Sequence, residues 1–281
     1  MKTSGLYTLL LLSLLAFSAC EDVVDVDLET GETLLVVQAR ITDSLMVQKV
    51  QLSTTAAYFS NQQTPRVSNA LVQLTEYNEN GEAVAVYPFV ADESAPGDYT
   101  YGPWAGTIGY TYELEINWND QQYEAITQLK RIPDIDSLRV FERIDQYPFE
   151  DGKYVQMFFQ ELPGKGDFMQ LKFYKNDTLI NDGGNLAYFD DPLVDGSYIG
   201  NFDITFEPFT LEDTVRVEMY SITREQFTFF NEMIGQVNNG GLFANPPANV
   251  RGNIINRDPS GPEALGFFAC TGFRAKEIIV K

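Results

Sequence analysis

Most of the chain between residues 33 and 220 alternates apolar and polar positions with a period of two. In the run 109–117, one face carries Tyr110, Tyr112, Leu114 and Ile116, and the other carries polar residues. The alternation recurs at 68–77, 167–175, 198–207 and 213–220. Because successive side chains of a strand point to opposite faces, this pattern indicates antiparallel sheets with one packed and one solvated face. The sequence therefore predicts a mainly β protein.

The first half of the chain predicts seven short strands separated by turns. They are expected near 33–41, 46–54, 68–77, 82–90, 98–101, 109–117 and 121–129. Asn80-Gly81 and Asn119-Asp120 stand between such runs and are typical of hairpin turns. Seven strands in about 100 residues match an immunoglobulin-like or transthyretin-like layout. We predict a β-sandwich over residues 33–131.

The segment 131–136 interrupts the alternation and predicts a domain boundary. Pro133 has no N–H to donate to a sheet, and polar residues flank it. Residues 132–281 are predicted to form a second β-rich, sandwich-like domain. Its strands are expected near 138–146, 153–161, 167–175, 198–207 and 213–220.

One helix is predicted, near residues 223–238. Phe227, Phe230, Ile234 and Val237 recur at spacings of three, four and three, which is typical of one helix face. Thr223 and Gln226 form a capping-box pattern at its start, and the segment 239–241 supplies a glycine-rich end. We expect this face to pack on the second domain, and a helix that binds a partner is the alternative.

The first 19 residues have the pattern of a secretory signal. Lys2 is followed by a nearly unbroken apolar run over 6–17, which as a helix would reach only about 18 Å, short of the roughly 30 Å hydrocarbon core. Ser18 and Ala19 are small and Cys20 follows them, a combination that resembles the bacterial lipoprotein signal. Phe17 departs from that pattern. We predict that Cys20 is acylated and attached to a lipid bilayer, and the alternative is an ordinary signal peptide.

Residues 20–32 form an acidic segment after this cysteine. Glu21 and Asp22 come first, and Asp25, Asp27 and Glu29 follow. A solvated tether is one interpretation. The other follows from Bacteroidetes-type lipoproteins, in which acidic residues after the lipidated cysteine resemble a signal for export to the outer face of the outer membrane. The second interpretation predicts a protein that faces the cell surface.

Charge and composition narrow the function classes. The chain has 281 residues with 40 acidic against 19 basic side chains, and the net charge of −21 argues against a nucleic-acid partner. It has no histidine, which removes Ser–His–Asp and Cys–His catalysis and imidazole metal sites. Cys270, the second of two cysteines, lies in an apolar run and is expected to be buried. We expect a protein without enzymatic activity.

Aspartates in glycine-containing loops are candidate calcium ligands. Asp190, Asp191 and Asp195 lie close together in one loop, and the segment 182–185 is similar. Ca²⁺ accepts six to eight oxygens in flexible geometry, although this spacing does not match an EF-hand. Ordinary solvated turns are the alternative, and no other cofactor is expected. Glu161 with Asp167 is a further carboxylate pair, and acid–base catalysis of glycoside hydrolysis by such a pair is the third hypothesis.

Aromatic residues gather around 99–112 and suggest a contact surface. Tyr101 and Trp104 are the candidate ligand contacts, because exposed rings can stack on sugars or fill a partner's groove. Trp104 stands between Pro103 and Ala105, where we expect an exposed loop.

Several short motifs occur in an order that resembles a known family. They are LVVQARITD at 35–43, ITREQF at 222–227, NPPANV at 245–250, GNI at 252–254 and ALGFF at 264–268, besides Cys20-Glu21. Together they resemble the Bacteroidetes outer-membrane lipoproteins catalogued as domain of unknown function 4249. The resemblance covers nearly all of the mature chain. It implies a lipoprotein encoded near TonB-dependent transporters, and it brings no catalytic residue.

The function expected from these features is that of a lipid-anchored lipoprotein of the outer membrane. It would act as an accessory subunit of a TonB-dependent transporter or a similar complex, with a β-barrel protein as its partner. The alternative is a surface protein that binds glycan or calcium on its own.

Overall fold

The computed structural model describes residues 32–56, 62–180, 187–205, 207–237 and 249–281. These residues are mainly β, with one helix among them, as the alternation predicts. Residues Thr33–Lys281 form one compact unit. No helix within the described ranges has the length and apolarity needed to span a membrane.

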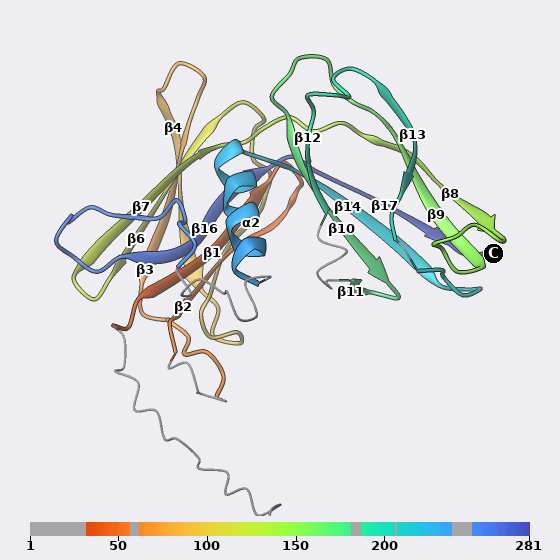
Figure 1. Cartoon of the computed structure of the whole chain (residues 1–281). Helices are drawn as coiled ribbons and strands as arrows, with labels where there is room; N and C mark the ends of the chain where they lie inside the picture. The colour runs from red at the N-terminus through yellow and green to blue at the C-terminus, as the bar shows by residue number, and fades with distance from the viewer. Residues whose placement is uncertain (1–31, 57–61, 181–186, 206, 238–248) are drawn as a thin grey trace, which may run out of the picture. The chain divides into compact units, whose positions relative to one another are not determined.

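A nine-stranded sheet forms the first part of the structure (Figure 1). Its order is β15-β7-β6-β3-β4-β5-β2-β1-β16. The bounds are β1 Leu35–Thr42, β2 Met46–Thr54, β3 Leu71–Tyr77, β4 Ala83–Ala91, β5 Asp98–Trp104, β6 Thr111–Trp118, β7 Gln121–Gln128, β15 Ile255–Asn256 and β16 Ala264–Thr271. Strand β16 also contacts β7, so the two ends of the sheet approach each other and nearly close a barrel.

The inner face of this sheet carries the residues that alternation places together. Tyr112, Leu114 and Ile116 of β6 are buried in the same apolar cluster as Leu74 and Val72 of β3. The seven strands expected before residue 131 all form, and Asn119 and Asp120 adopt positive φ angles in the turn between β6 and β7. The structure therefore confirms the period-two reading of this region.

These strands are joined into one continuous sheet at β4. Most of β4 pairs with β3, with Val72 opposite Phe89, and its last residues Val90 and Ala91 pair with β5. Strand β5 extends to Trp104, three residues beyond the expected end, so Trp104 does not lie in a loop.

Two smaller sheets contain the remaining described strands and form the second part of the structure. One has the order β11-β10-β14-β17, with β12 also pairing with β10, and the other has the order β13-β9-β8. Their bounds are β8 Ile135–Arg143, β9 Gly152–Gln160, β10 Phe168–Lys175, β11 Thr178–Ile180, β12 Ala187–Asp190, β13 Tyr198–Asp203, β14 Thr214–Ile222 and β17 Phe273–Ile279. A second apolar cluster lies among them and includes Met157, Phe173, Val217 and Met219.

The last two long strands, which the alternation does not predict, connect the sheets. Strand β16 pairs in parallel with β1, with Leu35 opposite Ala264 and Thr42 opposite Thr271 (Figure 1). After Gly272 the chain continues into β17, which pairs with β14. Ser221 of β14 accepts a hydrogen bond from the Gly272 N–H through its Oγ and donates its own N–H to the Gly272 carbonyl. Residues after 131 thus supply strands to both clusters, and the boundary expected there stays a prediction.

Helix α2 spans Arg224–Val237, close to the expected 223–238. Thr223 caps it, because its Oγ1 accepts a hydrogen bond from the Gln226 N–H at 3.2 Å. Phe227 packs on Phe168 of β10 and Tyr188 of β12, with ring centroids 5.1 and 5.3 Å apart. Phe229 contacts Phe267 of β16. The helix covers strands of the second part, as expected, and also meets the nine-stranded sheet; the glycine-rich end at 239–241 lies outside the described residues.

Candidate functional site

Three acidic side chains meet where strands of the second part end. Glu161 follows β9, Asp167 precedes β10 and Asp191 follows β12. The register of β10 and β12 places Phe168 opposite Asp190, so the next residues outward, Asp167 and Asp191, come close together. A carboxylate oxygen from each of the three lies within 4.8 Å of the others. We call Glu161, Asp167 and Asp191 the acidic triad.

Asp191 and Asp167 each accept hydrogen bonds that fix their positions in the acidic triad. Asp191 accepts the backbone N–H of Gly166 at 2.8 Å and that of Asp167 at 3.2 Å. Asp167 accepts from the Arg131 guanidinium at 2.6 Å, which also donates to the carbonyl of Gly164. These contacts hold the loop between β9 and β10 against the loop after β12.

Glu161 differs from its neighbours. The side chain is fully buried, and its Oε2 accepts the Gly196 N–H at 2.5 Å. Its Oε1 is buried and has no hydrogen-bond partner among the described residues. Burial raises the pKa of Glu161 above its ordinary value, and the charges of Asp167, Asp191 and Asp195 act in the same direction against the Gly196 hydrogen bond. An oxygen in this position is costly unless a proton or a cation satisfies it.

The predicted calcium ligands are only partly brought together. Asp191 belongs to the acidic triad, whereas Asp190 is the exposed last residue of β12. Asp195 accepts the Gly164 N–H at 2.7 Å and lies outside the three. The segment 182–185 falls outside the described residues, as do Cys20, Glu21 and Asp22. In the sequence, Glu161 and Asp167 suggest only an acid–base pair. The signal that could place them in a metal site is their position at the two ends of one short loop between predicted strands.

The candidate contact residues Tyr101 and Trp104 pack on the protein's own aromatic side chains. The Trp104 ring centroid lies 4.2 Å from that of Tyr87 and 5.9 Å from that of Tyr112. Tyr101 lies 5.2 Å from Tyr87 by the same measure. Both candidates are partly buried against the first apolar cluster, so neither ring is presented whole to a ligand.

A buried carboxylate lies beside Trp104. Glu76 accepts hydrogen bonds from the hydroxyls of Tyr87 at 2.5 Å and Tyr112 at 2.6 Å. Burial, followed by the hydrogen bond to Glu76, raises the pKa of both tyrosines well above the ordinary value. The tyrosines therefore remain protonated donors, and Trp104 packs against both of their rings.

Replacing Trp104 with alanine is expected to lower the free energy of unfolding by about 2 kcal/mol, because a half-buried ring leaves a cavity beside these tyrosines. Urea unfolding followed by circular dichroism measures the change. Tyr147→Ala is the control, since the Tyr147 side chain is 98% exposed and should change stability by less than about 0.5 kcal/mol. Equal stability of W104A and wild type would contradict a packing role and favour a surface contact.

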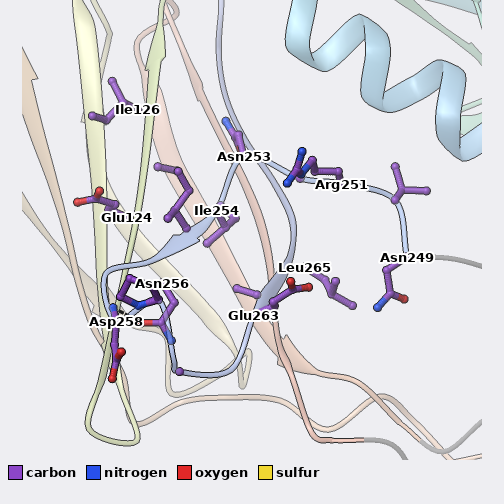
Figure 2. A pocket seen from close by; sticks show the side chains of 17 residues that line it. Glu124, Ile126, Asn249, Arg251, Asn253, Ile254, Asn256, Asp258, Glu263 and Leu265 are labelled. Carbon is purple, nitrogen blue, oxygen red and sulfur yellow. Dashed lines mark hydrogen bonds between the residues drawn. The ribbon is translucent and has the colours of Figure 1, made fainter.

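A hollow of about 720 Å³ lies between β7 and the segment 249–265 (Figure 2). Glu124 and Ile126 line it from β7, and Arg251 and Glu263 come from the segment. Two asparagine side chains that line the hollow, Asn253 and Asn256, make hydrogen bonds within the protein. The Asn253 side chain accepts the Phe268 N–H and donates to the Phe268 carbonyl, which fixes the segment to β16. Among the described residues that line the hollow, no buried side-chain nitrogen or oxygen lacks a hydrogen-bond partner, whereas the acidic triad contains one such oxygen.

Two basic residues meet where β1 lies near β10 and β14. The Arg40 guanidinium lies 4.2 Å from the centroid of the Tyr220 ring and donates to Gln170 at 2.9 Å. Lys172 Nζ lies 5.3 Å from the same ring. Burial, together with the charge of Arg40, lowers the pKa of Lys172 to about 8. No local spacing in the sequence indicates this contact, because Arg40 and Gln170 are 130 residues apart.

Comparison with known proteins identifies a family without assigning an activity. No curated protein matches the chain. The model of one family, described as a domain of unknown function (DUF4249), matches residues 21–277. This match confirms the resemblance carried by the short motifs and covers nearly the whole chain. The chain therefore belongs to the DUF4249 family.

Proposed function

We propose that this protein is a lipid-anchored lipoprotein of the outer membrane that faces the cell surface. One observation carries the proposal: Lys2, the apolar run over 6–17 and the small residues before Cys20 match a lipoprotein signal. Glu21 and Asp22 support export to the outer face. Several acyl chains on Cys20, at about 0.8 kcal/mol per buried CH₂, would make the attachment effectively permanent.

The activity we propose is that of a non-enzymatic accessory subunit of a TonB-dependent transporter or a similar complex. Exposed apolar side chains on one face of the nine-stranded sheet support the proposal that a partner protein binds there. Val72 and Phe89 face each other in the buried cluster, so alternation along β3 and β4 places Leu71, Val86 and Val90 on the outer face. Each of these three side chains is more than half exposed. Clustered exposed apolar residues are typical of interaction surfaces. We name these three residues the β3–β4 patch.

The finer architecture is also a proposal. The order and antiparallel pairing of β1 to β7 support an immunoglobulin-like or transthyretin-like sandwich over 33–131, in which β4 passes from one layer to the other. The second apolar cluster supports a second sandwich-like domain within 132–281.

Protease shaving and a pull-down test the proposed function together. Whole cells treated with an external protease should lose the protein, and extraction in mild detergent should recover it with a β-barrel membrane protein. Val90→Glu should reduce recovery of the barrel at least tenfold, because a charge enters the β3–β4 patch. Ile144→Glu is the matched control, since Ile144 is exposed and lies outside the nine-stranded sheet.

Three results would count against this function. Resistance to the external protease while a periplasmic marker stays intact would contradict surface exposure. Recovery of the protein without a barrel companion would contradict the accessory role. Equal loss of the companion in V90E and I144E would contradict the assignment of the contact to the β3–β4 patch. The alternative function, calcium binding by the protein on its own, is favoured by the unsatisfied Glu161 oxygen and is developed next.

A further inference from the structure

The acidic triad contains one group that the protein's own contacts do not satisfy. Backbone N–H groups and Arg131 account for the positions of Asp191 and Asp167. No comparable contact stabilises Glu161 Oε1, which is buried without a hydrogen-bond partner among the described residues. A fully buried, unpaired carboxylate oxygen destabilises a folded protein, so a ligand that supplies positive charge is the simplest partner.

The charge around this oxygen favours a cation with more than one charge. Three carboxylates converge, and Asp195 is close enough to act on Glu161. Within the described part of the chain, Arg131 is the cation that pairs with the acidic triad, through Asp167. Each carboxylate has about four acceptor positions, so Asp167 and Asp191 keep lone pairs free beside their present hydrogen bonds.

We propose that Glu161, Asp167 and Asp191 bind one Ca²⁺ ion. Ca²⁺ takes oxygen ligands at about 2.3–2.6 Å, so oxygens on one ion must lie within roughly 5 Å of one another. The three carboxylates meet this condition, since their ligand oxygens lie within 4.8 Å. Mg²⁺ requires shorter metal–oxygen distances and near-ideal octahedral geometry. Three carboxylates from the ends of three separate strands are less suited to that geometry.

The ion would join two loops that are distant in the sequence. Glu161 and Asp167 bound the loop between β9 and β10, and Asp191 begins the loop that leads to β13. Gly166 and Gly196, which donate N–H groups to Asp191 and Glu161, lie in these same loops. Calcium should therefore fix the two loops against each other and stabilise the second part of the structure. This inference does not depend on the membrane anchor or on a transporter partner.

Calcium titration of the purified full chain tests the proposal. The protein is treated with EDTA, freed of chelator and titrated with CaCl₂ in a calorimeter, and thermal unfolding is followed with and without the ion. We expect a dissociation constant on the order of 0.1 mM, as in extracellular calcium sites. At 100 times this concentration, the melting temperature should rise by about 5 °C or more. MgCl₂ at equal concentration should give a much smaller shift.

Two variants locate the site. Glu161→Gln keeps the shape of the side chain and removes its charge, and it should abolish the calcium-dependent shift. Asp190→Asn is the matched control, because it removes one charge next to Asp191 from an exposed residue outside the acidic triad, and it should retain the shift. If E161Q does not fold, Asp191→Asn replaces it, and the wild-type titration is decisive by itself.

The proposal is overturned by any of three results. The first is a wild-type protein that shows neither binding heat nor a shift with CaCl₂, which would mean that Glu161 is simply protonated. The second is an equal shift with MgCl₂, which would contradict the assignment to calcium. The third is loss of the shift in D190N as well as in E161Q, which would indicate diffuse attraction to an acidic surface.

Discussion

Replacing Gly266 with alanine should lower the free energy of unfolding by about 3–5 kcal/mol or prevent folding. Gly266 lies within β16 opposite Val37 of β1 and has a φ of +96°, a conformation that residues with a Cβ rarely adopt. A Cβ at this position would lie 1.9 Å from the Val37 carbonyl oxygen. Since that oxygen belongs to the backbone of the paired strand, β1 and β16 must separate.

Gly81→Ala provides the matched control for this effect. Gly81 has a φ of +79°, and no atom lies within 4 Å of its added Cβ. The control therefore carries the conformational cost alone, about 1–2 kcal/mol. Multiplying the difference in urea midpoint between the two variants by their common m-value gives the difference in the free energy of unfolding. This difference measures the cost of the steric clash between β1 and β16. Equal destabilisation of G266A and G81A would contradict the parallel pairing of these strands.

Cys20→Ser should move the protein from the membrane to the soluble fraction. The acyl chains proposed on Cys20 supply the attachment, and a serine hydroxyl is not a substitute for the thiol in the lipoprotein signal. Ultracentrifugation after an alkaline wash, followed by immunoblotting, measures the distribution. We expect at least a hundredfold fall in the ratio of membrane-bound to soluble protein.

Cys270→Ala is the matched control for the lipidation experiment. Cys270 is the other cysteine of the chain, and its thiol is buried in β16, where a lipid-transferring enzyme cannot reach it. The C270A protein should remain in the membrane fraction. Retention of C20S in that fraction would contradict anchoring through Cys20, and release of C270A would indicate that the fractionation reports folding instead.

Local patterns predicted the elements whose contacts are close in the sequence. Hairpin strands such as β6 and β7 follow from alternation and the Asn119-Asp120 turn, and α2 follows from its apolar face and the Thr223 cap. Strand β16 was not predicted, because its run of apolar residues lacks alternation, as in strands buried on both faces. Its partner β1 lies more than 220 residues away, a pairing that no local signal encodes.

The candidate metal ligands also could not be predicted in full from local sequence, because strand pairing decides which carboxylates meet. Asp190 and Asp191 are neighbours in the sequence, but successive residues of an extended chain point in opposite directions, so only Asp191 joins the acidic triad. The register of β10 with β12 brings Asp167 next to Asp191. Glu161 is held beside them by its hydrogen bonds with Gly196 and Ser197, in the loop that follows Asp191. Trp104 was expected in a loop because Pro103 precedes it, and the pairing of Met46 with Trp104 instead extends β5.

Mass spectrometry of the N-terminal peptide of the protein from native membranes tests the central claim most directly. The account predicts a mature chain that begins at Cys20 and carries the added mass of a diacylglyceryl group on the thiol. A chain with an unmodified thiol at Cys20, or one that keeps residues 1–19, would contradict the lipid anchor and with it the proposed place at the cell surface.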